Sequence, residues 1–96
     1  MPTFEANEPF LDDYDHLTDE RRAAFKAAVR KFVHDLRAGQ FRKGLRVKRV
    51  VGRDGVWELT WADDGRATFS YGDPVVPGDA HIIWRRVGTH DIFDEP

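Results

Sequence analysis

The first half of the chain places its apolar residues at the spacing of α-helices. Residues 19–38 carry one apolar stripe at intervals of three and four, made of Phe25, Val29, Phe32 and Leu36. Thr18 is a suitable N-cap for this helix, and Gly39 is a suitable residue to follow its end. Residues 9–17 repeat the spacing over a shorter distance, with Phe10, Tyr14 and Leu17. The pattern therefore predicts a short helix and a long one.

After residue 40 the apolar residues alternate with polar ones, which is the period of a β-strand. Segments rich in glycine, aspartate and proline separate the alternating stretches. The predicted strands cover 45–51, 56–61, 66–71 and 81–87, and a short edge strand is expected at 3–6. This order predicts a single α+β domain over residues 1–96, with two N-terminal helices packed on one face of a twisted antiparallel sheet of three to five strands. The other face is left open to solvent or to a ligand.

The formal net charge of −2 hides a sharp partition along the chain. Residues 1–20 hold seven acids and neither Lys nor Arg, whereas residues 21–53 hold twelve bases and one acid. Residues 54–96 are acidic again, with three bases and nine acids. The central block favours a local site for a polyanion. Alternatively, the twelve bases of residues 21–53 could simply cover the solvent-exposed side of a helix and a hairpin.

Composition argues against several classes of protein. The chain has no cysteine, and its four histidines lack the spacing of metal ligands, so we expect neither a metal nor a cofactor. No apolar run is long enough to span a membrane. The N-terminal segment carries acids where a secretory signal would carry bases, and we therefore expect a cytoplasmic protein.

Residues with useful chemistry gather on the predicted open face. Alternation along 81–87 places Arg86 there with Ile82 and Trp84, and places Arg85 on the opposite side with Val87, which is expected to be core. A meander would bring four side chains into one concavity: Glu58, Arg66, Arg86 and His90. Such a set suits metal-free cleavage of RNA, in which a base takes the 2′-hydroxyl proton, an acid protonates the leaving 5′-oxygen and arginine holds the phosphoryl charge.

Each of these residues also has a purely structural interpretation. Glu58 could form a cross-strand ion pair with Arg49 or Arg66. Arg85 and Arg86 could be charges that protect an edge strand from aggregation. His90 could cap a turn.

Two segments carry a resemblance to a known family: "GVWELTWADDGRATFSYG" (55–72) and "WRRVGTHDIF" (84–93). They resemble the RelE/ParE superfamily of toxins from bacterial type II toxin–antitoxin systems, and the ending is most similar to the RelE and YafQ branches. The resemblance implies a helical N-terminal hairpin followed by an antiparallel sheet. It also implies a last strand that ends in a glycine turn with a catalytic histidine or arginine.

Matched residue by residue, the resemblance implies a role for each of several side chains. Arg66 falls at the phosphate-binding arginine, Arg86 at an active-site arginine, and His90 at the catalytic histidine or arginine. Phe93 falls near a terminal aromatic that positions RNA. The basic run 41–49 falls where members contact ribosomal RNA, and it contains Arg46, Lys48 and Arg49.

The function implied is that of a toxin which cuts messenger RNA on the ribosome, without a metal, and blocks translation. Its partners would be a cognate antitoxin, the ribosome with its message, and in some arrangements a second copy of the chain. The alternative is a binding module without catalysis, either a gyrase-directed toxin or an inactive relative that acts through partner contacts. Glu58 and Thr60 favour this alternative, because they stand where some members have lysines.

Overall fold

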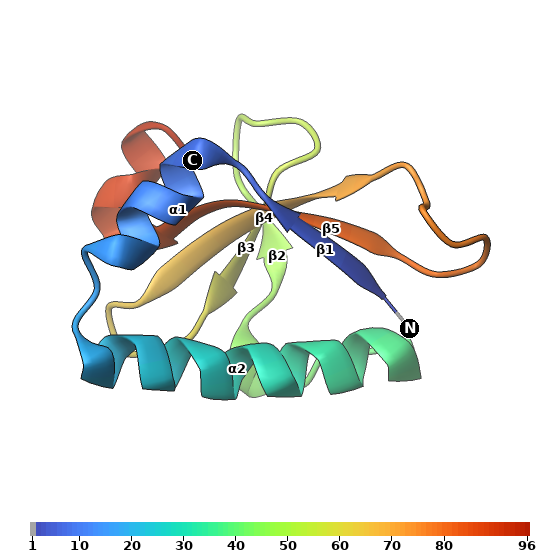
Figure 1. Cartoon of the computed structure of the whole chain (residues 1–96), viewed down its shortest axis with the longest axis horizontal. Helices are drawn as coiled ribbons and strands as arrows, with labels where there is room; N and C mark the ends of the chain where they lie inside the picture. Colours follow the sequence, from blue (N-terminus) through green and yellow to red (C-terminus); the bar gives the residue numbers. More distant parts are fainter. Residues whose placement is uncertain (1) are drawn as a thin grey trace.

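The computed structural model describes residues 2–96. Within this range the elements follow in the order β1 (Thr3–Ala6), α1 (Glu8–Asp15), α2 (Asp19–Ala38), η1 (Lys43–Leu45), β2 (Lys48–Arg49), β3 (Trp57–Thr60), β4 (Arg66–Gly72), β5 (His81–Gly88) and η2 (His90–Asp94). The two η elements are short 3₁₀-helices. Figure 1 shows α2 running across one side of the sheet, while α1 lies nearer the end of β5.

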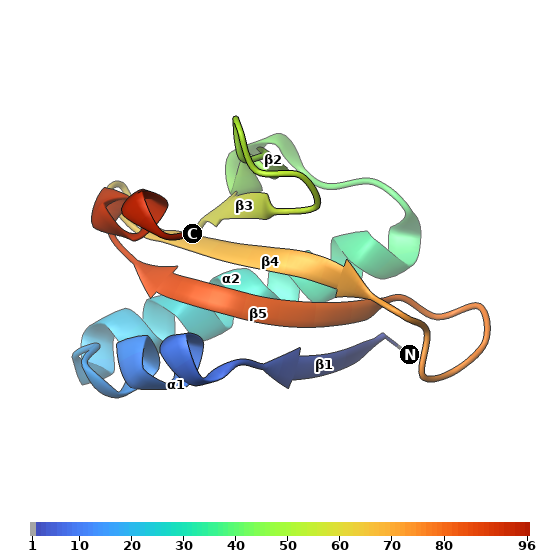
Figure 2. The same ribbon diagram turned by 90° about the horizontal axis from the view of Figure 1, so that it is seen from above.

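The strands form one twisted sheet in the order β1-β5-β4-β3-β2 (Figure 2). The predicted α+β class with two helices is confirmed, and so is the edge strand at residues 3–6. β1 pairs with β5 in the parallel sense, so the sheet is mixed rather than wholly antiparallel. A parallel pair needs a long connection, and here that connection is most of the chain, including both helices. Alternation in the sequence carries no information on strand direction, which is why the polarity of this edge strand was not predicted.

Local signals fix the ends of both helices. Thr18 Oγ1 accepts a hydrogen bond from the backbone N–H of Arg21 at 3.2 Å, and Gly39 ends α2 in the left-handed region at φ 83°. Asn7 Oδ1 accepts from the backbone N–H of Phe10 at 3.2 Å and caps α1 in the same manner. The predicted bounds of the long helix, 19–38, are confirmed.

The hydrophobic core lies between α2 and the face of the sheet that it covers. Phe32 of α2 is fully buried, and its ring packs on Phe41, Phe69 and Trp84 at centroid distances of 5.2, 5.0 and 5.4 Å. At the other end of the core, Phe10 of α1 contacts Phe25 and Trp84. Aromatic pairs at these separations add to the free energy of burial, so the two helices share one apolar layer above the sheet.

The predicted strand at 45–51 is wrong over most of its length, since β2 contains only Lys48 and Arg49. Residues 43–45 form η1 instead, and Arg46 adopts a left-handed backbone at φ 49°. Leu45 is buried in the core and Val47 packs against it, although neither belongs to a strand. The alternation of apolar residues in 45–51 therefore reflects the burial of Leu45 and Val47 and not the pairing of a strand.

No helix within residues 2–96 has the length and apolar content needed to cross a membrane.

Candidate active site on the open face of the sheet

The face of the sheet turned away from α2 carries a row of polar side chains across four strands. The pairings Lys48–Glu58, Glu58–Thr68 and Thr68–Arg86 put these residues side by side on β2, β3, β4 and β5. Neighbouring strands are about 4.8 Å apart, so the row crosses the sheet in three steps. We call Lys48, Glu58, Thr68 and Arg86 the open-face row.

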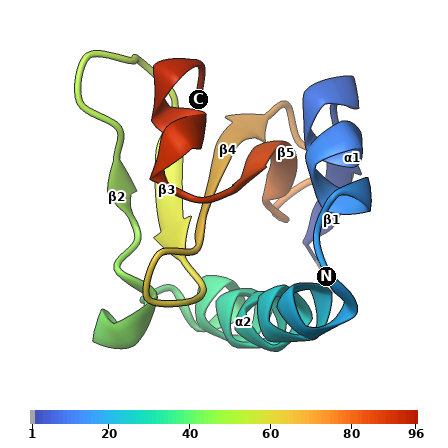
Figure 3. The same ribbon diagram turned by 90° about the vertical axis from the view of Figure 1, so that its left-hand side faces the viewer.

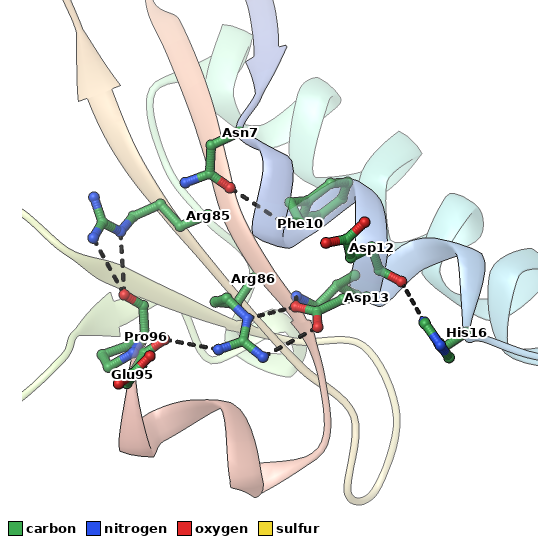
Figure 4. A network of polar contacts seen from close by, with 10 residues as sticks. Asn7, Phe10, Asp12, Asp13, His16, Arg85, Arg86, Glu95 and Pro96 are labelled. Carbon is green, nitrogen blue, oxygen red and sulfur yellow. Dashed lines mark hydrogen bonds and ion pairs between the residues drawn. The ribbon is translucent and has the colours of Figure 1, made fainter.

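A β-bulge in β5 decides which side chains reach this face. Thr68 pairs with Arg86, but the next residue, Phe69, pairs with Trp84, so β5 contains one extra residue at Arg85. Trp84 and Val87 are consequently both core residues, 6% and 2% exposed. Arg85 lies on the open side with Arg86, because its Nη1 contacts Ser70 Oγ at 3.5 Å and both guanidinium groups reach the C-terminal segment (Figure 4). The predicted separation of Arg85 from Arg86, and the placement of Trp84 beside Arg86, are wrong.

Arg86 is bound by an acidic residue of the first helix. Its Nε donates to Asp13 Oδ2 at 2.6 Å, and its Nη2 donates to Asp13 Oδ1 at 3.1 Å. Asp13 also accepts the backbone N–H of Val87 at 3.2 Å. The hydrogen bonds to Asp13 raise the pKa of Arg86 above its usual range, while partial burial opposes the rise. Arg86 therefore keeps its charge, and Asp13 balances much of it.

The C-terminal residues fold back onto the same arginines (Figure 4). Arg86 Nη1 donates to the main-chain oxygen of Glu95 at 3.0 Å. Arg85 donates to the main-chain oxygen of Pro96 from Nε at 3.3 Å and from Nη2 at 3.2 Å. A cavity of about 430 Å³ adjoins these contacts and is also lined by Arg53 from the β2–β3 turn.

Arg66 is 8% exposed and is held by the turn that precedes β4. Its Nη1 donates to the main-chain oxygens of Ala62, Asp63 and Gly65 at 3.2, 3.1 and 2.9 Å. Its Nε and Nη2 form no hydrogen bond within residues 2–96. One end of the guanidinium group thus fixes the β3–β4 turn, and the other retains donors for a ligand.

His90 and Phe93 lie on η2, which packs over the open face near the end of β5 (Figure 3). Gly88 permits this close return, because a Cβ atom there would lie 3.1 Å from Ile92 Cγ2. The ring of His90 is exposed and contacts Phe93 at a centroid distance of 5.7 Å. Its nitrogens form no hydrogen bond or ion pair in the described part of the chain. The imidazole is therefore free to exchange a proton with a ligand.

Glu58 and Thr68 form the centre of the open-face row. The ion-pair partner of Glu58 is Lys48, with Nζ and Oε1 3.9 Å apart, rather than the predicted Arg49 or Arg66. Thr68 is fully buried, and its hydroxyl has no hydrogen-bond partner among residues 2–96. A buried hydroxyl without a partner is unusual. Sequence reasoning missed Thr68, because nothing in the sequence distinguishes it from other strand threonines.

The predicted RNA-binding residues Arg46, Lys48 and Arg49 are all exposed. They follow a loop anchored by Asp35, which accepts from the backbone N–H and the Nε of Arg42 at 2.8 and 2.7 Å. The hydrogen bonds from Arg42 hold the pKa of Asp35 well below its usual range. Lys48 points to the open face and Arg49 to the other, as their pairing with Glu58 and Trp57 requires.

Within residues 2–96 there is no cluster of three or more His, Cys, Asp or Glu side chains that could hold a metal ion. The open face instead offers the exposed imidazole of His90 and the carboxylate of Glu58 beside the ammonium group of Lys48. It also offers three arginines that donate some of their hydrogen bonds to main-chain oxygens, namely Arg66, Arg85 and Arg86. These groups are suited to proton transfer and to contact with a phosphate.

Comparison with known proteins identifies the fold. No protein-family profile and no curated protein sequence matches the chain. Among solved structures, a chain of the Escherichia coli DinJ–YafQ toxin–antitoxin complex is similar over 94% of this chain and 93% of its own, with a TM-score of 0.69 and 11% identity. A chain of the RelB–RelE antitoxin–toxin complex from Methanococcus jannaschii gives a TM-score of 0.61 and 20% identity, with 95% and 98% covered.

The YoeB/ParE toxin from Agrobacterium tumefaciens is similar over 92% of this chain and 98% of its own, with a TM-score of 0.66 and 11% identity. The match extends over nearly the whole length of each protein. This chain therefore has the fold of the RelE/ParE toxins, as the resemblance in its sequence predicted.

Proposed function

We propose that this protein is the toxin of a type II toxin–antitoxin system, and that it cuts messenger RNA bound to the ribosome and so blocks translation. The observation that carries the proposal is the exposed, uncommitted imidazole of His90, which η2 holds beside the open face of a sheet with the toxin fold. The reaction needs no metal, because each proton transfer is assigned to a side chain.

In the proposed reaction Glu58 takes the proton of the ribose 2′-hydroxyl, and the 2′-oxygen attacks the adjacent phosphorus. The bond from phosphorus to the 5′-oxygen breaks, and protonated His90 gives its proton to that oxygen. Lys48 forms an ion pair with Glu58, with Nζ and Oε1 3.9 Å apart, and so places a positive charge beside the base. Phe93, in contact with His90, stacks on a neighbouring base.

Arginines provide positive charge for the phosphoryl group in this proposal. Arg66 uses its Nε and Nη2, which make no hydrogen bond to any of the residues 2–96. Arg86 contributes through Nη1 once a phosphate replaces the main-chain oxygen of Glu95. Arg46, Lys48 and Arg49 hold the flanking RNA and the ribosomal RNA through their charges.

A second candidate is a toxin that acts by contact alone, either on gyrase or through another partner. The pairing of Arg86 with Asp13 favours it, because a charge already balanced by a carboxylate stabilises a transition state less. The two candidates differ in one observable, the cutting of RNA.

The proposed partners are a cognate antitoxin, the ribosome and its message, with a second copy of the chain as a further candidate. Two of the similar solved structures are toxin–antitoxin complexes, which supports the antitoxin. Because its proposed partners are the ribosome and messenger RNA, we propose that the protein acts in the cytoplasm.

Expression of the chain in a bacterial host tests the toxin function. The wild type should arrest growth, and co-expression of the reading frame next to its gene should relieve the arrest. His90→Ala should leave growth unaffected at equal protein level. Growth that continues with the wild type would contradict the toxin proposal, and arrest by His90→Ala would favour the contact-only toxin.

A further inference from the structure

A second surface lies near the β2 edge of the sheet, on the face opposite to the open-face row. The helix α2 covers this face only in part. Arg49 pairs with Trp57 across β2 and β3, and its guanidinium carbon lies 5.2 Å from the centroid of the Trp57 ring. Trp57 in turn meets Tyr71 of β4 edge to face, at 5.9 Å and 86°. These three side chains form a continuous strip, which we call the aromatic platform.

The aromatic platform is rigid beneath and accessible above. Tyr71 packs on the fully buried Phe69 at 5.7 Å, and yet 44% of its surface is exposed. Arg49 is exposed and Trp57 is half-buried. Single exposed aromatic residues are ordinary on protein surfaces. Two adjoining rings with a guanidinium group over one of them form a larger surface with a specific chemistry.

The charge around the platform indicates what it binds. Residues 42–53 contain six bases, namely Arg42, Lys43, Arg46, Lys48, Arg49 and Arg53, and no acid. Single-stranded RNA combines negative phosphates with bases whose flat faces stack on aromatic rings and guanidinium planes. We infer that Arg49, Trp57 and Tyr71 bind unpaired RNA bases by stacking.

This inference rests on the proposed function, in that the substrate is RNA, and it adds a contact outside the reacting centre. β2 is an edge strand, so among residues 2–96 no further strand blocks the way around it. Lys48 faces the open-face row and Arg49 faces the platform on the two sides of this edge. An RNA strand can therefore cross the edge with its phosphates near these two cations, one part on the open face and another on the platform.

The test measures binding to two polyanions that differ in having bases. The probes are a 2′-O-methyl oligoadenylate, which cannot be cut through its 2′-oxygen, and inorganic polyphosphate of similar charge. Tyr71→Ala should weaken oligoadenylate binding about fivefold or more, the range expected for one stacked base, and leave polyphosphate binding unchanged. Tyr71→Phe keeps the ring and should bind as the wild type does. Val75→Ala, which alters a residue 65% exposed in the following loop, is the matched control.

Three results would overturn the inference. The wild type could bind oligoadenylate no better than polyphosphate, Tyr71→Ala could bind oligoadenylate as the wild type does, or Tyr71→Ala could lose both probes equally. If Tyr71→Ala binds oligoadenylate as the wild type does, the aromatic platform would be a candidate contact for a protein partner instead. The outcome is independent of catalysis, since the uncut probe reports the platform and cleavage of ribosome-bound message reports the open face.

Discussion

Asp13 of α1 and Arg86 of β5 form a two-bond ion pair, with donor–acceptor distances of 2.6 and 3.1 Å. Asp13 thereby joins the acidic N-terminal segment to the strand that carries the candidate site. Because Asp13 also accepts the N–H of Val87, it holds the chain directly after the β-bulge. The pair belongs both to the fold and to the electrostatics of the open face.

Asp13→Asn should lower the free energy of unfolding by about 2 kcal/mol, because it removes hydrogen bonds to a charged group that is only partly exposed. The side chains of Arg86 and Asp13 are 26% and 19% exposed. Urea unfolding at neutral pH measures the change. Asp12→Asn is the matched control, since Asp12 is exposed on the same helix. Equal stability of the two variants would show that the pair contributes nothing to the fold.

Asp35 should make the stability of the protein depend on pH. Its pKa is lowered below the ordinary value of 3.8 by the hydrogen bonds from Arg42. A carboxyl group with a lowered pKa in the folded state stabilises the fold above its unfolded pKa and loses that contribution as the pH falls through the folded pKa. The difference in free energy of unfolding between the wild type and Asp35→Asn should therefore be largest at neutral pH and shrink progressively below about pH 4. A difference that does not change between neutral and strongly acidic buffers would contradict this account.

Thr68→Val should make the protein more stable and less active. The substitution removes a buried hydroxyl that has no partner in the described part of the chain and preserves the side-chain shape, which should raise the free energy of unfolding by about 1 kcal/mol. Thr68 lies between Glu58 and Arg86 but is fully buried, so its hydroxyl can affect a reaction at the open-face row only through the surroundings of these two neighbours, and its loss should slow that reaction. Thermal unfolding and RNA cleavage are the two measurements. Thr60→Val on the adjacent strand is the control, and a variant with unchanged activity would remove Thr68 from the site.

RNA and ribosome affinity should fall steeply as salt rises, because contacts to phosphates release counterions. The triple variant Arg46→Glu, Lys48→Glu, Arg49→Glu should abolish binding and retain the fold. A control with the same change in charge reverses three exposed bases of α2, namely Lys26, Arg30 and Lys31. Filter binding over a series of salt concentrations measures the RNA affinity of the wild type and of both triple variants. Equal loss in both triple variants would mean that net charge alone governs the affinity.

Much of the fold could be predicted because the signals for it are local. Thr18 and Gly39 mark the ends of α2, and apolar spacing identifies its buried face. The bulge in β5 was missed, although Trp84 and Val87 are three residues apart where a regular strand would need an even spacing. That interval is a usable signal for a bulge when two charged residues lie between two core residues.

The candidate site was harder to predict because its contacts are distant in sequence. Asp13 and Arg86 are separated by 73 positions, and no local pattern relates them. The resemblance implied a phosphate-binding role for Arg66, but nothing in the sequence predicted that three main-chain oxygens of the preceding turn hold one end of its side chain. Turn geometry of this kind depends on backbone carbonyls, which leave no trace in residue types.

Cleavage of ribosome-bound message by the purified protein tests the central proposal most directly. The wild type should cut the message, and His90→Ala should reduce the rate by about 10²–10⁴, the usual effect of removing a proton-transfer group. Val75→Ala should cut as the wild type does. If the wild type leaves the message intact, or if His90→Ala cuts it at the wild-type rate, His90 is not the proton donor of a ribonuclease and the open face does not perform this reaction.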